Sequence, residues 1–163
     1  MDPILLATLV RRLHLAIRAE ILDYVHDHGY RDLTPPQVYV LQSPGPDGFG
    51  PTELARRTLM TKQALNHVLA RMEAAGYLER HDSDHDARAR VVRLTERGRD
   101  VTRLLIEASA LLQDRWAQLI GPEQMEALVG TLRDLDAHVA GETGVPAGWA
   151  DARAEPPANP TGG

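Results

Sequence analysis

The sequence of 163 residues lacks cysteine altogether, has a single phenylalanine and is poor in aromatic residues overall. Without cysteine the chain can form no disulfide, no thiolate metal site and no thiol-based nucleophile or redox sensor. It also lacks any apolar run close to the ~18 residues that a membrane span requires. Near the N-terminus, Asp2 stands where a secretory signal would carry basic residues. We therefore expect a cytoplasmic protein with no membrane partner.

Signals for catalysis are missing as well. The chain has no Gly-rich phosphate loop, no nucleophile elbow and no pattern typical of a buried carboxylate pair. The segment 43–50 contains glycines, but prolines interrupt them and no lysine follows. We expect a protein that is not an enzyme and holds no metal or other cofactor.

Charge is distributed unevenly along the chain. The net charge of -5 argues against a protein that coats nucleic acid without regard to sequence, because phosphate binding draws on clustered Lys and Arg. Between Pro51 and Asp100, however, ten Lys and Arg outnumber eight Asp and Glu, so this segment is net +2 and the rest of the chain is net -7. Positive charge is thus concentrated in one central segment.

The first part of the chain predicts two helices and a loop. Apolar residues recur at four-residue steps over about 3–28, which indicates a long amphipathic helix that Gly29 ends. A second, short helix is predicted with Thr34 as its N-cap and Pro35 at the first helical position. The segment 43–50 holds two prolines and three glycines, so we expect a loop there.

A helix-turn-helix is predicted in the basic segment. Thr52 is the expected N-cap of a short helix over about 53–57, and Thr61 begins a second helix over about 61–75. Gly76 ends that helix. Two short helices joined by a three-residue turn form the helix-turn-helix arrangement, whose second helix is offered to the DNA major groove.

A β-hairpin and two further helices complete the prediction. Strands are expected over 77–80 and 88–94, with a polar turn over 81–87 between them. Two helices follow, one capped by Thr95 and one over about 122–139. The predicted fold class is mainly α with a small β-hairpin wing, that is, a winged helix-turn-helix with a helical dimerisation layer.

Polar side chains gather on one face of the predicted helix 61–75, opposite its apolar residues. Asn and Gln can pair with two atoms of adenine, and Arg and Lys with two atoms of guanine, so these residue types suit the reading of base edges. The candidate DNA-binding residues on this helix are Thr61, Lys62, Gln63, Asn66, His67 and Arg71. A solvated polar face without a ligand is the alternative interpretation.

The second predicted strand carries a further group of candidates. Asp86, at the end of the predicted turn, lies two residues before Arg88 and four before Arg90, so in an extended hairpin the three share a face. Arg88, near the tip, could enter a DNA minor groove while Asp86 orients its guanidinium, so we count Arg88 and Arg90 as DNA-binding candidates. An exposed ion pair of little consequence is the alternative. The acidic turn residues Asp82, Asp84 and Asp86 would repel phosphate unless arginines screen them.

Four segments of the chain resemble the multiple-antibiotic-resistance regulator (MarR) family of winged helix-turn-helix transcription regulators. They are Thr52-Glu-Leu-Ala-Arg-Arg, Met60-Thr-Lys-Gln-Ala-Leu, Met72-Glu-Ala-Ala-Gly-Tyr-Leu-Glu-Arg and Asp86-Ala-Arg-Ala-Arg-Val-Val-Arg-Leu-Thr-Glu-Arg-Gly. The similarity covers about residues 5–140, and it implies that Asp86 and Arg88 form the wing with Arg88 in the minor groove. Leu59 and Ala87 depart from the family pattern, in which glycine and arginine are common at these places.

The resemblance also implies a homodimer that reads an inverted-repeat operator in double-stranded DNA. Independently, the apolar stripes of the first and the last two predicted helices exceed what a small winged domain could cover, and an isologous helical interface would bury them. We therefore divide the chain into four parts. They are an N-terminal dimerisation helix (1–32), a winged helix-turn-helix region (33–98), C-terminal dimerisation helices (99–140) and a Gly/Ala/Pro-rich flexible tail (141–163).

A small aromatic or anionic effector is a further implication of the resemblance, bound between the dimer layer and the winged region of a repressor. Residues that could line such a cleft are His14, Arg18, Tyr24, Tyr39 and Trp116. For the aromatic members of this set, core packing is the alternative.

Two groups of residues raise the question of a metal site. One is Asp23 with His26 and His28, and the other lies in the turn segment 81–86. Helical spacing puts Asp23 and His26 on one face but leaves His28 elsewhere, so we expect no structural site.

A second functional hypothesis stays open, in which the winged helix is a protein-interaction module without specific DNA binding. It predicts that Arg71 and Arg88 are dispensable.

Overall fold

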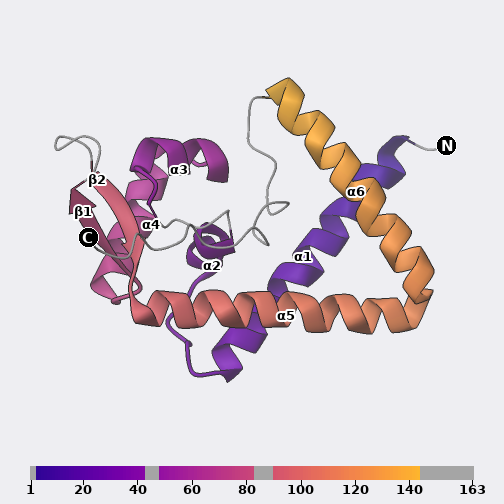
Figure 1. Cartoon of the computed structure of the whole chain (residues 1–163), viewed down its shortest axis with the longest axis horizontal. Helices are drawn as coiled ribbons and strands as arrows, with labels where there is room; N and C mark the ends of the chain where they lie inside the picture. The colour runs from indigo at the N-terminus through magenta and orange to yellow at the C-terminus, as the bar shows by residue number, and fades with distance from the viewer. Residues whose placement is uncertain (1–2, 43–47, 83–89, 144–163) are drawn as a thin grey trace, which may run out of the picture.

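The computed structural model describes residues 3–42, 48–82 and 90–143 of the chain. It is mainly helical with one antiparallel hairpin, as the sequence predicts (Figure 1). In chain order the elements are α1 Pro3–Asp27, α2 Pro35–Gln42, α3 Pro51–Thr58, α4 Lys62–Ala74, β1 Leu78–Asp82, β2 Arg90–Leu94, α5 Glu96–Ile120 and α6 Pro122–Thr143. The last helix is thus longer than predicted, and residues 144–163 of the expected tail lie outside the described residues.

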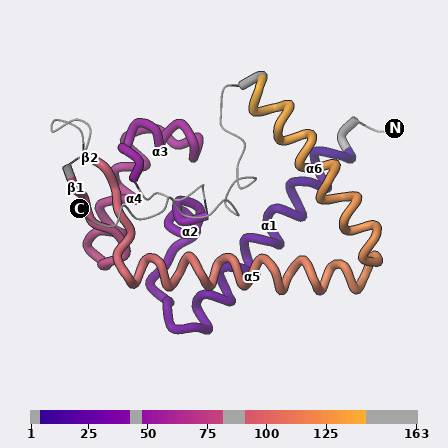
Figure 2. Tube along the Cα trace, in the orientation of Figure 1, coloured from indigo at the N-terminus to yellow at the C-terminus, as the bar shows by residue number. Residues whose placement is uncertain are grey.

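The long helix α5 connects the two ends of the fold. It contacts α2 and β2 near its start, α1 crosses it, and α6 folds back from its far end (Figures 1 and 2). The helix-turn-helix and the hairpin therefore lie at one end of α5, and α6 with the first half of α1 lies toward the other.

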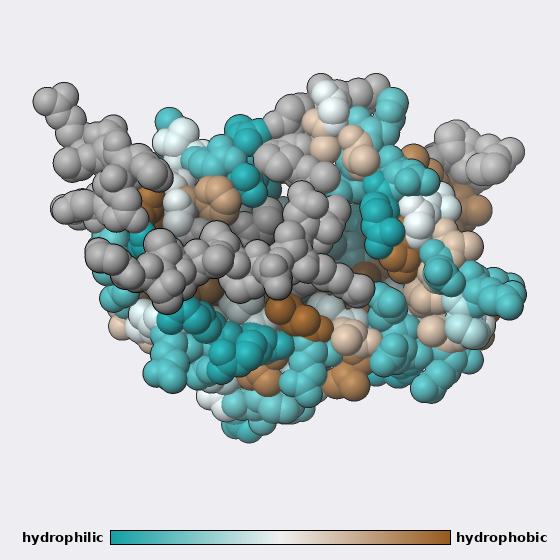
Figure 3. All heavy atoms as spheres, viewed as in Figure 1, coloured by the Kyte–Doolittle hydropathy of each residue, from teal (hydrophilic) through white to brown (hydrophobic). Residues whose placement is uncertain are grey.

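The hydrophobic core lies around α4. Leu65, Leu69 and Met72 are fully buried, as their helical spacing predicts, and they belong to one cluster with buried residues of α1, α2, α3, both strands and α5. The opposite end of the molecule keeps large apolar side chains at the surface, part of which is visible on the right of Figure 3. The exposed large apolar side chains of α1 and α6 are Leu5, Leu6, Leu9, Val10, Leu13, Leu15, Leu128, Leu132, Leu135 and Val139.

Helix ends follow the local signals in most places. Gly29, Gly76 and Gly121 all have a positive φ where helices end, a conformation that glycine adopts without strain. Thr95 caps α5, because its hydroxyl oxygen accepts the backbone N–H of Gly98 at 3.1 Å.

The start of α3 differs from the prediction. The helix begins at Pro51 with Gly50 at the N-cap, so the prediction of Thr52 as N-cap is wrong. Proline suits the first helical position because a backbone N–H there would have no partner within the helix.

The first strand of the hairpin starts at Leu78, one residue later than predicted, and extends further. β1 continues to Asp82, so His81 and Asp82 belong to the strand, and Asp82 pairs with Arg90 at the start of β2. Phe49, expected in a loop, forms an antiparallel bridge with Val92, whose backbone N–H donates to the Phe49 carbonyl at 3.0 Å. Local periodicity cannot reveal such a pairing, because the partner lies far along the chain.

Gly98 allows the start of α5 to lie against the start of β1. A Cβ atom on Gly98 would lie 2.1 Å from the carbonyl oxygen of Tyr77 and 3.0 Å from a methyl carbon of Leu94. The same carbonyl accepts the backbone N–H of Thr95 at 3.2 Å. Any side chain at position 98 would therefore push α5 away from the hairpin.

We expect Gly98→Ala to lower the free energy of unfolding by about 1–3 kcal/mol or more, because the added methyl group overlaps a backbone oxygen that cannot move freely. Urea unfolding followed by circular dichroism measures this. Gly130→Ala in α6 is the matched control, since a Cβ there meets nothing within 4 Å and helix propensity alone should raise stability by up to about 1 kcal/mol. Equal free energies of unfolding for the two variants would contradict the close approach of residue 98 to the Tyr77 carbonyl.

Candidate nucleic-acid interface

The outward face of α4 carries the polar side chains that the sequence indicated. Gln63, Asn66, His67 and Arg71 lie on the side of α4 away from the buried Leu65, Leu69 and Met72, and Thr61 and Lys62 lie at its N-terminal end. All six candidates are exposed. The hydroxyl oxygen of Thr61 accepts the backbone N–H of Ala64 at 3.2 Å and so caps the helix. The face presents amide donors and acceptors, an imidazole and two cationic groups on one rigid helix, which is the chemistry that base edges in a major groove require.

The turn before α4 has an unusual backbone at Leu59. Among the described residues, Leu59 is the one non-glycine residue with a positive φ, at 53°. The N–H of Met60 donates to the carbonyl of Ala55 at 3.2 Å, so α3 ends in a Schellman-type turn. Position 59 thus has the left-handed backbone conformation that glycine adopts freely, even though leucine occupies it.

Two arginines of α3 lie beside this turn and were not singled out from the sequence. The guanidinium carbon of Arg57 is 4.1 Å from the ring centre of Phe49, and its Nε donates to Glu53 at 2.7 Å. Arg56 donates to the same carboxylate at 2.8 and 3.0 Å. The hydrogen bonds from Arg56, followed by those from Arg57, lower the pKa of Glu53 to about 2 and keep it ionised. The i,i+3 and i,i+4 spacings of Glu53 were readable in the sequence, whereas the stacking on Phe49 depends on its bridge to β2.

The hairpin is joined to α4 at its base. The Nε of Arg80 lies 3.2 Å from a carboxylate oxygen of Glu73. Arg90 begins β2, but its side chain, together with Asp86 and Arg88 of the predicted wing tip, lies outside the described residues. The wing half of the predicted DNA-binding site therefore stays a prediction.

The structure brings together two of the five residues predicted to line an effector cleft. The guanidinium carbon of Arg18 lies 5.8 Å from the ring centre of Tyr39. Tyr24 packs instead against the imidazole of His28, just after the end of α1, with ring centres 4.2 Å apart. His14 is exposed on α1, and Trp116 lines a separate cavity. Among these residues the Arg18–Tyr39 pair alone combines a cation and an aromatic ring in contact.

The cavity that Trp116 lines lies between α1, α5 and α6 and has a volume of about 230 Å³. Its walls are apolar apart from Ser109 and Gln113. The lining residues are Ile17, Ile21, Ser109, Leu112, Gln113, Trp116, Met125, Leu128, Val129 and Leu132. It adjoins the exposed apolar side chains of α1 and α6, and it does not belong to the polar face of α4.

The histidines considered as metal ligands make hydrogen bonds to the backbone. The Nε2–H of His26 donates to the carbonyl of Leu33 at 2.8 Å, and the Nδ1–H of His28 donates to the carbonyl of Tyr24 at 2.7 Å. Within the ranges that the structure describes, no three His, Asp or Glu side chains are grouped so that they could hold a metal ion. Most of the second predicted group lies in the segment 83–89, outside those ranges.

We expect Leu59→Gly to raise the free energy of unfolding by about 0.5–1 kcal/mol. Glycine removes the cost of about 1–2 kcal/mol that a Cβ imposes in the left-handed region, less the entropy that a glycine adds to the unfolded chain. The side chain of Leu59 is 75% exposed, so little packing is lost. Thermal and urea unfolding give the difference. Leu59→Ala is the control, because it retains the Cβ; an equal gain from alanine would refute the argument from strain.

Comparison with known proteins agrees with the fold. A family model described as MarR family matches residues 31–89. The HTH-type transcriptional regulator YfiV of Bacillus subtilis (strain 168) is 30% identical over 98 residues, which cover 60% of this chain and 61% of YfiV. The chain therefore matches about three fifths of the length of that relative.

Solved structures of such regulators superpose on most of the chain. The transcriptional repressor CouR, bound to a 23-mer DNA duplex, has 26% identity and a TM-score of 0.64, over 80% of this chain and 91% of CouR. A crystal structure of MarR has 20% identity and a TM-score of 0.68, over 88% of this chain and 95% of MarR, and so supports the fold alone. Among the described helices, none combines the length and apolarity needed to cross a bilayer. With its helix-turn-helix, its hairpin and the central segment that matches the family model, the chain is similar to winged helix-turn-helix transcription regulators of the MarR family.

Proposed function

We propose that this protein is a regulator that binds duplex DNA in a sequence-specific manner, acts in the cytoplasm as a homodimer and is not an enzyme. The observation that carries the proposal is the exposed face of α4, where Lys62, Gln63, Asn66 and Arg71 share a rigid helix backed by the core. A protein of the same fold, CouR, has been solved bound to a DNA duplex, which supports DNA as the partner of this fold.

In the proposed complex the N-terminal half of α4 enters the major groove. Gln63 and Asn66 suit adenine and Lys62 suits guanine, because their donors and acceptors match those base edges. Arg71, two turns further along, and Arg56 of α3 lie where phosphate contact would position the helix without reading sequence. Arg88 and Arg90 of the wing would add contacts in the neighbouring minor groove.

The charge balance fits a reader of specific sites better than a general DNA coat. The segment from Pro51 to Asp100 is net +2, whereas the remainder is net -7. Negative charge elsewhere weakens non-specific attraction to the polyanion, so affinity depends more on the contacts of α4.

A homodimer would cover the apolar surface at the other end of the molecule. Large side chains of α1 and α6, among them Leu9, Leu13, Leu132 and Leu135, are exposed, and patches of this kind mark protein interfaces. A two-fold axis through this end would place two α4 helices on one face of a duplex, which suits an inverted repeat with half-sites about one turn apart.

Repression relieved by an effector is the proposed mode of regulation. The Arg18–Tyr39 pair lies between α1 and α2, and it offers a cation and a ring to a small aromatic anion. A ligand that binds better to one spacing of the two α4 helices than to another would lower operator affinity by shifting that equilibrium.

Selection of binding sites from random duplex DNA, with affinities repeated across salt concentrations, tests DNA recognition. We expect an inverted repeat with steep salt dependence. Asn66→Ala should then lose about 1–3 kcal/mol of preference at one base pair, whereas Arg88→Ala should weaken all sequences and lower the salt slope by about 1. Gln124→Ala, which removes an exposed amide from α6, is the control. It should change neither the base preference nor the salt slope.

Two results would count against this assignment. If Asn66→Ala weakened every sequence equally, its role in base reading would be wrong. If no sequence were enriched even at low salt, and Arg71→Ala and Arg88→Ala changed nothing measurable, the alternative of a winged-helix protein-interaction module would be favoured.

The dimer is tested by sedimentation of the full chain. We expect Leu135→Glu to shift the wild-type dimer toward monomer, because the change would bury an unpaired carboxylate in an apolar interface. Leu59→Glu makes the same change at an exposed leucine of the α3–α4 turn and should leave the dimer intact. A monomeric wild type, or an equally dimeric Leu135→Glu variant, would contradict the proposed interface.

A further inference from the structure

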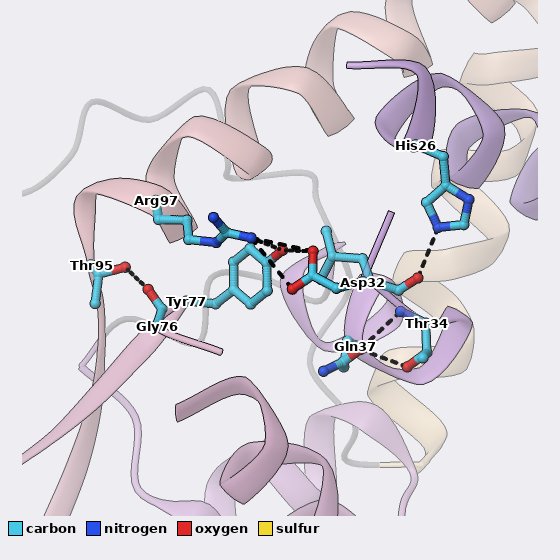
Figure 4. A network of polar contacts seen from close by, with 9 residues as sticks. His26, Asp32, Thr34, Gln37, Gly76, Tyr77, Thr95 and Arg97 are labelled. Atoms are coloured by element: carbon cyan, nitrogen blue, oxygen red, sulfur yellow. Dashed lines mark hydrogen bonds and ion pairs between the residues drawn. The ribbon is translucent and has the colours of Figure 1, made fainter. Parts of the chain in front are cut away.

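Three side chains from distant parts of the sequence meet near the C-terminal end of α4 (Figure 4). Asp32 lies in the turn between α1 and α2, Tyr77 lies between α4 and β1, and Arg97 lies in the first turn of α5. We propose that Asp32, Tyr77 and Arg97 are positioning residues that set the angle of α4 relative to α1 and α5, and thereby the half-site spacing that the protein prefers. This inference rests on the proposed DNA-binding dimer.

The network is closed by direct hydrogen bonds. The hydroxyl of Tyr77 donates to Asp32 Oδ1 at 2.7 Å and accepts from Arg97 Nη2 at 2.9 Å. The same Nη2 lies 3.2 and 3.3 Å from the two carboxylate oxygens of Asp32. The guanidinium of Arg97 also lies over two rings, 4.6 Å from the centre of Tyr77 and 5.4 Å from that of Tyr30. Each of the three groups therefore contacts both of the others.

Tyr77 is well placed to transmit this geometry to α4. Its backbone N–H donates to the carbonyl of Met72 in the last turn of α4 at 2.9 Å, and its side chain is fully buried. The hydroxyl of Thr95 donates to the carbonyl of Gly76 at 2.6 Å, which ties the end of α4 to the start of α5 a second time. A shift of the Tyr77 ring would thus move the C-terminal end of α4.

The protonation states favour a stable network at neutral pH. Burial, followed by the hydrogen bond to Asp32, raises the pKa of Tyr77 to about 12, so its phenol keeps the proton that it donates. Partial burial would raise the pKa of Asp32, but the hydrogen bond from Tyr77 and the charge of Arg97 outweigh it and lower that pKa. The network is therefore a neutral donor between two opposite charges.

Small angles matter because α5 is long. Its 25 residues span about 37 Å, and the network lies at one end while the apolar surface of α6 lies at the other. A tilt of about 5° over this length moves the far end by about 3 Å, close to the ~3.4 Å rise of one base pair. In a dimer joined through α1 and α6, a looser network would let the two α4 helices fit operators of neighbouring spacing.

The experiment compares affinities for the selected inverted repeat with those for operators that have one base pair inserted or deleted between the half-sites. Tyr77→Phe removes only the hydroxyl and keeps the buried ring, and Asp32→Asn and Arg97→Gln each remove one charge. For all three variants we expect the ratio of affinities between the best and the altered spacing to fall at least threefold, with unchanged binding to a single half-site. Arg103→Gln, which removes a guanidinium paired with Asp100 on the same helix, is the control and should keep the wild-type ratio.

A merely structural role would lower thermal stability and the active fraction but would leave the spacing ratio as in the wild type, and that result would overturn the inference. The double variant with Tyr77→Phe and Arg97→Gln should relax the ratio no further than the stronger single variant, because the two residues act through one network. Additive effects would contradict this. If the wild type itself bound no inverted repeat, the proposed function would fail first, an outcome distinct from failure of the positioning role alone.

Discussion

The backbone of α5 lies against the carbonyl of Tyr77 because residue 98 has no side chain, and most of the winged region depends on this contact. It brings the first turn of α5 beside the end of α4, where Thr95 bonds to the carbonyl of Gly76. It also places Arg97 within reach of Tyr77 and Asp32. A larger residue at position 98 would separate these partners together, since they all rely on the same distance between α5 and β1.

The two ends of the molecule have opposite surface chemistry. Around α4 the apolar side chains are buried and the outward face is polar, whereas α1 and α6 leave leucines exposed. In a monomer these apolar side chains stay in contact with water and contribute no free energy of burial. The cavity between α1, α5 and α6 is open on the same side. The surface pattern therefore separates an end suited to another protein surface from an end suited to nucleic acid, with α5 as the rigid link between them.

The position of α4 is set by its two ends and its inner face. Its start is capped by Thr61, its inner face is in the core, and its end is tied to α5 and β1. The residues proposed to read bases thus project from a helix whose position is set elsewhere in the fold. In the proposed dimer, small changes between α1, α2 and α5 would change the spacing of the two α4 helices.

The order and type of the elements could be predicted from the sequence, because periodicity, caps and glycines act over a few residues. The long helices, the cap at Thr61 and the outward polar face of α4 are local properties of this kind. The cap at Thr52 was misjudged because proline at position 51 starts the helix two residues earlier than predicted. The left-handed turn at Leu59 also gave no local signal, since leucine does not favour that conformation.

Contacts between distant segments were decided by the tertiary structure alone. Phe49 meets β2 and stacks on Arg57 only once the hairpin has folded against α3. Asp32, Tyr77 and Arg97 lie far apart in the chain, and each has an ordinary local environment in the sequence. Their hydrogen bonds exist because α5 packs against β1, so no pattern of neighbouring residues could have indicated them. The sequence by itself determined the kind of fold and the chemistry of the α4 face, and the packing of α5 decided which residues hold that face in place.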